Sequence, residues 1–225
     1  MHETFRLLVT SIFLLASGDM GVSFAQQGAP SAPVPIQTPV QIAPFNSIEV
    51  RNGGHVIFRP ATTQRVSLVR GSLDYTRLGV TDRGALVIDK CIRKCPRGYQ
   101  VEIEIFAPNL TRISLANGGR IQSRGSFSRQ SDLAVAVSHG GTIDVRSMVV
   151  DRVTASVDQG GRILTVPEAW LFARVTQGGV ITYWGDGQVK SSVEHGGVVH
   201  KGTPDQINLS LSEVGFSFPP PTTHR

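Results

Sequence analysis

A pair of adjacent glycines recurs along this chain and limits the structures that it can form. Each pair follows a polar residue, and from position 117 onward these polar residues stand at 117, 139, 159, 177 and 195, which gives spacings of 22, 20, 18 and 18 residues. Such near-regular spacing is typical of stacked structural units. The glycine pairs are Gly53 and Gly54, Gly118 and Gly119, Gly140 and Gly141, Gly160 and Gly161, Gly178 and Gly179, and Gly196 and Gly197.

Apolar residues alternate with other residues on both sides of each glycine pair, which is the period of a half-buried β-strand. The last inward residue before a pair and the first one after it are six positions apart, as with Val157 and Ile163. This even offset favours a strand that bends at the glycines and keeps one face inward, although a three-residue hairpin loop also satisfies it. We therefore expect an all-β solenoid of stacked parallel coils with Gly-Gly corners. The expected ladders are Val137, Val157, Val175 and Val193, and Ile143, Ile163, Ile181 and Val199.

Glycine suits such a corner because the bend requires a positive φ or leaves no room for a side chain. A side chain at the corner would meet its copy in the next coil. We therefore expect Gly160→Val to destabilise the fold more than an ordinary surface substitution does.

The first 25 residues have the organisation of a secretory signal peptide. Arg6 precedes an apolar stretch over 7–16, and Ser23 and Ala25 are small residues at the positions that signal peptidase recognises. Residues 26–44 predict a Pro-rich linker, residues 45–211 the folded domain, and residues 212–225 a flexible Pro-rich tail. We expect an exported protein that resides in the periplasm, at the cell surface or outside the cell. The apolar stretch is too short for a retained transmembrane anchor, and we expect no stable membrane insertion once the signal peptide has been cleaved.

Two cysteines, Cys91 and Cys95, stand four positions apart. In an oxidising compartment they are expected to form a disulfide. A zinc site would need four ligands, and a thioredoxin-like motif would have two intervening residues rather than three. We expect no metal site and no cofactor.

The charge of the chain does not indicate nucleic-acid binding. Its formal net charge is +5, no run of lysines and arginines is present, and aromatic residues make up only 7% of the chain. Nucleic acids usually require a basic cluster or several aromatic platforms for base stacking. We expect no nucleic-acid partner.

The sequence contains no recognisable catalytic motif, whether a nucleophile elbow, a Walker loop or a His-Glu-x-x-His pattern. His139 and His195 would lie three coils apart, too far to share one metal ion. Asp158 and Glu194 would lie two coils apart, about 10 Å at 4.8 Å per coil. That distance is near the upper end of the range for an inverting pair of carboxylates, so a carbohydrate-active enzyme stays an alternative. We assign no catalytic residue.

Three stretches resemble the bacterial head GIN domain family, which is described both as a family of auto-transporter adhesin heads and as a domain of unknown function. They are Phe45 to Val56, with the first glycine pair, Val101 to Leu110, and Tyr183 to Gly197. The resemblance covers about residues 45–202 and implies a right-handed β-solenoid, export and a role in adhesion, with no catalytic residues. The turns of the family usually read Gly-x-Gly, whereas those of this chain read polar-Gly-Gly.

Trp170, Tyr183 and Trp184 stand near the variable corners and are candidate ligand contacts, or else they cap the end of the stack. The expected function is therefore non-catalytic: an exported solenoid that presents a stacked β surface to a cell-envelope component, a polysaccharide or a protein. The alternatives are a lyase or hydrolase on a β-helix scaffold and a structural component of the envelope-stress response. The sequence assigns no oligomeric state.

Overall fold

The computed structural model describes residues 37–203, and all of the secondary structure in that range is β. The expected signal peptide, the linker residues 26–36 and the chain from residue 204 onward lie outside the described residues. Within 37–203 there is no helix that could cross a membrane.

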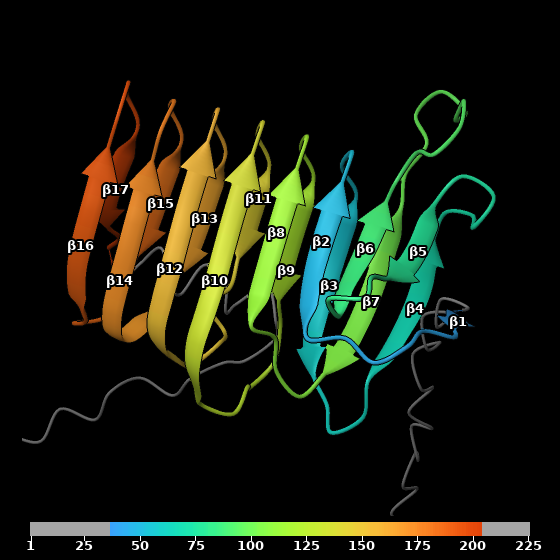
Figure 1. Ribbon diagram of the computed structural model, residues 1–225, viewed down its shortest axis with the longest axis horizontal. Helices are drawn as coiled ribbons and strands as arrows, with labels where there is room; N and C mark the ends of the chain where they lie inside the picture. The colour runs from blue at the N-terminus through green and yellow to red at the C-terminus, as the bar shows by residue number, and fades with distance from the viewer. Residues whose placement is uncertain (1–36, 204–225) are drawn as a thin grey trace, which may run out of the picture. The chain divides into compact units, whose positions relative to one another are not determined.

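Seventeen strands of the described range form two sheets (Figure 1). The nine-stranded sheet has the order β1 (Thr38–Val40), β4 (Arg65–Arg70), β7 (Glu102–Ala107), β3 (His55–Pro60), β9 (Arg120–Ser123), β11 (Thr142–Asp144), β13 (Arg162–Thr165), β15 (Val180–Tyr183) and β17 (Val198–Lys201). The eight-stranded sheet has the order β16 (Gln188–Val193), β14 (Pro167–Val175), β12 (Val150–Asp158), β10 (Gln130–Ser138), β8 (Arg112–Ala116), β2 (Ser47–Arg51), β6 (Ala85–Asp89) and β5 (Arg77–Val80).

The strands on the two sides of each Gly-Gly corner belong to different sheets, so that one unit contributes one strand to each sheet. In the eight-stranded sheet Val137 is in register with Val157, Val157 with Val175, and Val175 with Val193, all in parallel pairs. In the nine-stranded sheet Ile143, Ile163, Ile181 and Val199 follow one another in the same way. Both predicted ladders are confirmed, and the alternative of antiparallel hairpins at the glycines is wrong. The right-handed winding stays a prediction.

The first part of the domain departs from a purely parallel stack. Strand β1 pairs with β4, β4 with β7, and β5 with β6 in antiparallel fashion, so that both sheets are mixed. The unit of β2 and β3 lies between the β6–β7 unit and the β8–β9 unit, out of chain order (Figure 1). The short turn at Thr81, whose backbone N–H donates to the carbonyl oxygen of Ala85 at 2.9 Å, explains one reversal. Such tight turns join antiparallel strands, whereas parallel strands require a long crossover.

The core lies between the two sheets and consists mainly of Ile, Val and Leu from the inward rows. Phe58 and Phe127 add an aromatic contact there, with ring centroids 4.8 Å apart. Inward and outward positions alternate along each strand, so every second residue points away from the core. The candidate sites are therefore built from outward rows.

The two glycines of a corner differ, which corrects the expectation for Gly160. Both have a positive φ, but a Cβ on Gly160 would meet no heavy atom within 4 Å. A Cβ on Gly161 would collide with Cγ1 of Val137 in the neighbouring unit and would lie 3.2 Å from the carbonyl oxygen of Gly141. The crowding predicted for the corner therefore belongs to the second glycine only. At Gly160 the positive φ alone disfavours a side chain.

Cys91 and Cys95 form the predicted disulfide, with their Cα atoms 6.1 Å apart. It lies in the loop that joins β6 to β7. Tyr99 of the same loop ties it to the neighbouring loop, because its hydroxyl accepts a hydrogen bond from the backbone N–H of Ser72 at 2.8 Å.

Candidate ligand-binding surfaces

The outer face of the eight-stranded sheet carries mostly small side chains over β8, β10 and β12. The small outward residues there are Ser114, Ala134, Ala136, Thr154 and Ser156, and Arg112 of β8 is the register partner of Ala134. Because the strands are parallel and in register, these residues form continuous rows across the sheet. The result is a surface of small side chains that is bounded by the longer side chains of Arg112 and Arg152.

Two aromatic residues of β14 interrupt this surface. Trp170 and Phe172 stand two positions apart and are both partly exposed, with ring centroids 5.9 Å apart and planes inclined by 10°. The Nζ atom of Lys190, on β16, lies 5.5 Å from the centroid of the Trp170 ring. A cation above an indole face is attracted by the ring quadrupole. We call the group of Trp170, Phe172 and Lys190 the aromatic patch.

Arginines flank the aromatic patch on two sides. Arg152 is the register neighbour of Trp170 on β12, and it forms an ion pair of 2.9 Å with Asp132. Arg174 follows Phe172 on the outward side of β14 and forms an ion pair of 3.1 Å with Glu194. All four side chains are largely exposed, so these ion pairs contribute little to stability. The two arginines can therefore pair with another anion instead.

Tyr183 ends β15 of the other sheet and Trp184 follows it, so neither residue joins Trp170. Tyr183 is half-buried and packs against the core. Trp184 is only 4% exposed, and its Nε1–H donates to the carbonyl oxygen of Thr203 at 2.9 Å. Trp184 is therefore not an exposed aromatic residue, because the backbone at Gly202 covers the ring, and its contact with a ligand stays a prediction.

A hollow of about 320 Å³ opens beside Trp184 on the outer face of the nine-stranded sheet. Leu164, Val180 and Thr182 are among the residues that line it, together with Arg162 and His200. Arg146 forms another wall, and its guanidinium lies 5.1 Å from the centroid of the Trp184 ring.

The guanidinium of Arg146 is fixed by the buried carboxylate of Asp144. The Nε–H of Arg146 donates to Oδ1 at 2.9 Å and one of its terminal amino groups donates to Oδ2 at 2.6 Å. The side chain of Asp144 is 5% exposed and that of Arg146 14%. A bidentate pair of this kind sets the direction of the guanidinium. Asp144 already compensates the positive charge of Arg146. The hollow therefore attracts an anion less strongly than the presence of Arg146 and Arg162 suggests.

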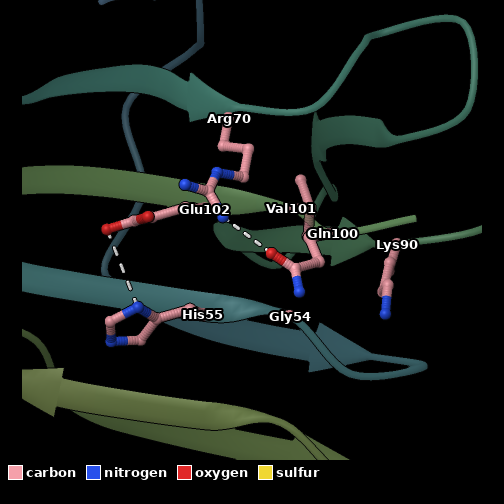
Figure 2. A pocket seen from close by; sticks show the side chains of 7 residues that line it. All are labelled: Gly54, His55, Arg70, Lys90, Gln100, Val101 and Glu102. Atoms are coloured by element: carbon pink, nitrogen blue, oxygen red, sulfur yellow. Dashed lines mark hydrogen bonds and ion pairs between the residues drawn. The ribbon is translucent and has the colours of Figure 1, made fainter. Parts of the chain in front are cut away.

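A second hollow, of about 240 Å³, lies where β3 and β7 begin (Figure 2). Arg70 donates to the side-chain carbonyl of Gln100 at 2.7 Å, and Nδ1 of His55 lies 3.7 Å from Oε1 of Glu102. Lys90 lines the same hollow. Among residues 37–203, Nε2 of His55 is buried and finds no hydrogen-bond partner.

Burial lowers the pKa of His55, because the protonated ring loses hydration. The carboxylate of Glu102 opposes this effect, and Arg120 and Arg124 lower the pKa further. The hollow thus combines cationic and anionic groups whose charges partly compensate one another. This mixed lining favours a structural role over a strong ligand site.

Residues 37–203 contain no group of three or more His, Cys, Asp or Glu side chains that could hold a metal ion. Sequence reasoning named Trp170 but missed Phe172 and Lys190. Phe172 could have been found, because it stands two residues after Trp170 and so shares its face of the strand. Lys190 could have been found from the 18-residue repeat, which places it beside Phe172.

Several solved structures are similar to this chain. One described as a "putative adhesin" from Bacteroides fragilis is 18% identical, with a TM-score of 0.40, and the match covers 74% of this chain and 96% of the other. A "putative cell adhesion protein" from Clostridium sporogenes is 11% identical, with a TM-score of 0.34 and coverage of 73% and 99%. A "Putative lipid binding protein" from Parabacteroides distasonis is 14% identical, with a TM-score of 0.29 and coverage of 74% and 96%.

Among curated proteins none matches this chain. The profile of one family does match, over residues 44–169, which is more than half of the chain. This range includes the out-of-order β2–β3 unit and ends one residue before Trp170, so the aromatic patch lies beyond it. The chain belongs to the family described as "Putative auto-transporter adhesin, head GIN domain".

Proposed function

We propose that this protein is an exported, non-catalytic adhesin that binds acidic polysaccharide through the outer face of its eight-stranded sheet. The observation that carries the proposal is the aromatic patch, in which two nearly parallel rings lie beside Lys190 next to rows of small side chains. Membership of an adhesin family supports the same kind of role.

The chemistry of the patch matches a polymer of uronic acids. The faces of Trp170 and Phe172 can pack against the apolar C–H faces of sugar rings, as amphipathic aromatic side chains do in many binding surfaces. Lys190 can pair with a sugar carboxylate, and Arg152 and Arg174 can exchange their surface partners for further carboxylates. The net charge of +5 adds a weak long-range attraction to a polyanion.

The surface around the patch has room for a long chain. The rows of small side chains over β8, β10 and β12 continue from the aromatic patch across neighbouring strands, which lie about 4.8 Å apart. Ala134 and Thr154 therefore leave room for a polymer between Phe172 and Arg112, and the row of Ser114, Ala136 and Ser156 holds no bulky side chain. Many weak contacts of this kind would add up through multivalency rather than through one deep pocket.

The arrangement of carboxylates supports binding rather than cleavage. Asp132 and Glu194, two of the acidic side chains near the patch, each pair with an arginine. A glycosidase would instead keep one carboxyl group protonated as a general acid, opposite a second one across the scissile bond. Export is supported by the disulfide between Cys91 and Cys95, which is typical of oxidising compartments.

The test is calorimetric titration of the protein with polygalacturonate and with uncharged dextran. We expect binding to polygalacturonate only, weakened by added salt. Trp170→Ala combined with Phe172→Ala should weaken it by about tenfold or more, since central aromatic anchors usually contribute more than about 1.4 kcal/mol. The matched control is Phe106→Ala, which removes the ring 4.1 Å below the Arg65 guanidinium on the other sheet.

Retained affinity in the Trp170 and Phe172 variant would refute the patch as the binding surface. An equal loss in the Phe106 variant would indicate a general structural effect instead. Release of reducing ends or of unsaturated products from the polymer would favour the carbohydrate-active enzyme over the adhesin.

A further inference from the structure

The stack of units ends at β16 and β17, which are the edge strands of their sheets within the described residues. Val193 of β16 and Val198 of β17 are 46% and 48% exposed. Val193 continues the inward ladder of Val137, Val157 and Val175, whose other members are buried. The last row of the core is therefore uncovered by residues 37–203. An exposed parallel edge with an apolar row is a ready site for another strand.

The sequence that follows β17 repeats the pattern of β16. Register partners on β14 and β16, and on β15 and β17, stand 18 positions apart, as with Val175 and Val193 or Ile181 and Val199. Adding 18 to the inward residues of β16, which are Val189, Ser191 and Val193, leads to Ile207, Leu209 and Leu211. Adding 18 to its outward residues Lys190 and Ser192 leads to Asn208 and Ser210. The apolar and polar alternation of a strand is thus preserved in phase.

The corner after this segment also agrees with the repeat. A Cβ on Gly197, the second glycine of its corner, would collide with Cγ1 of Val175. The residue 18 positions after Gly197 is Gly215, so the one corner position with no room for a side chain is again glycine. Beyond it the pattern ends, because Ser217 falls at the inward position of Val199.

The connection has the same length as the preceding one. Residues 184–187 join β15 to β16, and residues 202–205 stand between β17 and Gln206. A segment tethered by four residues has a high effective concentration at the adjacent edge, which favours it over a second copy of the chain.

We propose that residues 206–211 of this chain dock as a parallel strand on the free edge of β16. Ile207, Leu209 and Leu211 then cover Val189, Ser191 and Val193. The docked segment completes the apolar row and occupies the backbone groups of the edge. It thereby prevents end-to-end association of copies, and this role is independent of any ligand on the outer face of the sheet.

The decisive experiment is a cysteine crosslink in the full chain. In the proposed register Ser192 and Ser210 are direct neighbours, and parallel neighbours lie within the Cα separation of about 4.4–6.8 Å that a disulfide bridges. We expect S192C/S210C to form an intramolecular disulfide under mild oxidation. The matched control, S192C/S212C, places the second cysteine two residues further along the strand, beyond the reach of a disulfide, and should not crosslink.

Each other outcome of this experiment contradicts the proposal. A disulfide-linked dimer of S192C/S210C would show that the strand comes from a second copy. No crosslink, or equal crosslinking of the two pairs, would show that the segment does not dock in this register.

A second measurement does not depend on cysteines. Leu211→Asp introduces a charge at an inward position, whereas Ser210→Asp introduces it at an outward position of the same segment. We expect the melting temperature to fall by about 5 °C or more for Leu211→Asp and to change little for Ser210→Asp. Equal melting temperatures for the two variants would overturn the proposal.

Discussion

Gly161→Ala should destabilise the domain much more than Gly160→Ala, although the two residues are adjacent. The new Cβ at position 161 would collide with Cγ1 of Val137, whereas the one at position 160 would project into open space. Both positions have a positive φ, +84° at Gly160 and +112° at Gly161. The pair therefore separates the effect of crowding from that of backbone conformation.

The expected magnitudes follow from these two effects. A left-handed backbone costs an alanine about 1–2 kcal/mol, and the reduced freedom of the unfolded chain offsets about 0.4–1 kcal/mol. Gly160→Ala should therefore lower the free energy of unfolding by roughly 1 kcal/mol. Overpacking adds about 1–3 kcal/mol for Gly161→Ala, which gives a total of roughly 2–4 kcal/mol.

Urea denaturation followed by circular dichroism measures both changes, provided that the m-value stays constant. A double-mutant cycle with Val137→Ala identifies the cause, because that substitution removes the colliding methyl group. We expect Gly161→Ala to cost less in the Val137→Ala background. Equal denaturation midpoints for the two alanine variants, or strict additivity in the cycle, would refute the crowding argument.

Three further results are expected. Replacing both cysteines by serine should lower the free energy of unfolding by about 2 kcal/mol, because the bridge closes a short loop; two free thiols in the intact mass of the non-reduced protein would contradict the bridge itself. Asp144→Asn should lower the free energy of unfolding by about 3 kcal/mol in chemical denaturation, since it removes the charged partner of a buried guanidinium. Asp151→Asn affects an exposed ion pair and should lower it by at most about 1 kcal/mol. The lowered pKa of His55 means that the unfolded chain binds a proton more readily than the folded one. The free energy of unfolding should therefore fall as the pH drops below the ordinary histidine pKa of 6.5. His55→Gln should reduce this pH dependence in melting curves recorded across the same range.

The repeats after residue 117 could be predicted from the sequence almost in full. The even offset between Val157 and Ile163 fixed the inward face on both sides of the corner, and the 18-residue spacing fixed the register of β12, β14 and β16. Period-two alternation and glycine spacing are local signals, so they can be recognised in the sequence without knowledge of tertiary contacts.

The first part of the domain could not be ordered in this way. Val50 and Val56 show the same offset of six around Gly53 and Gly54. No local sequence signal indicates, however, that β2 pairs with β8, which begins at Arg112. The burial of Trp184 could not be predicted from the sequence either. It depends on the backbone at Gly202 and on Arg146 of another unit, which only the assembled sheets bring together.

The interior position of β2 has a consequence for how the polypeptide acquires its structure. This strand is hydrogen-bonded to β6 on one side and to β8 on the other, and both are made later during synthesis. The first neighbour of β2 is complete only once residues up to Asp89 have been made, and both neighbours are complete only at about Ala116. Trimming from the C-terminal side would shorten the stack by one layer at a time, whereas deleting residues 47–60 would open a gap in its middle.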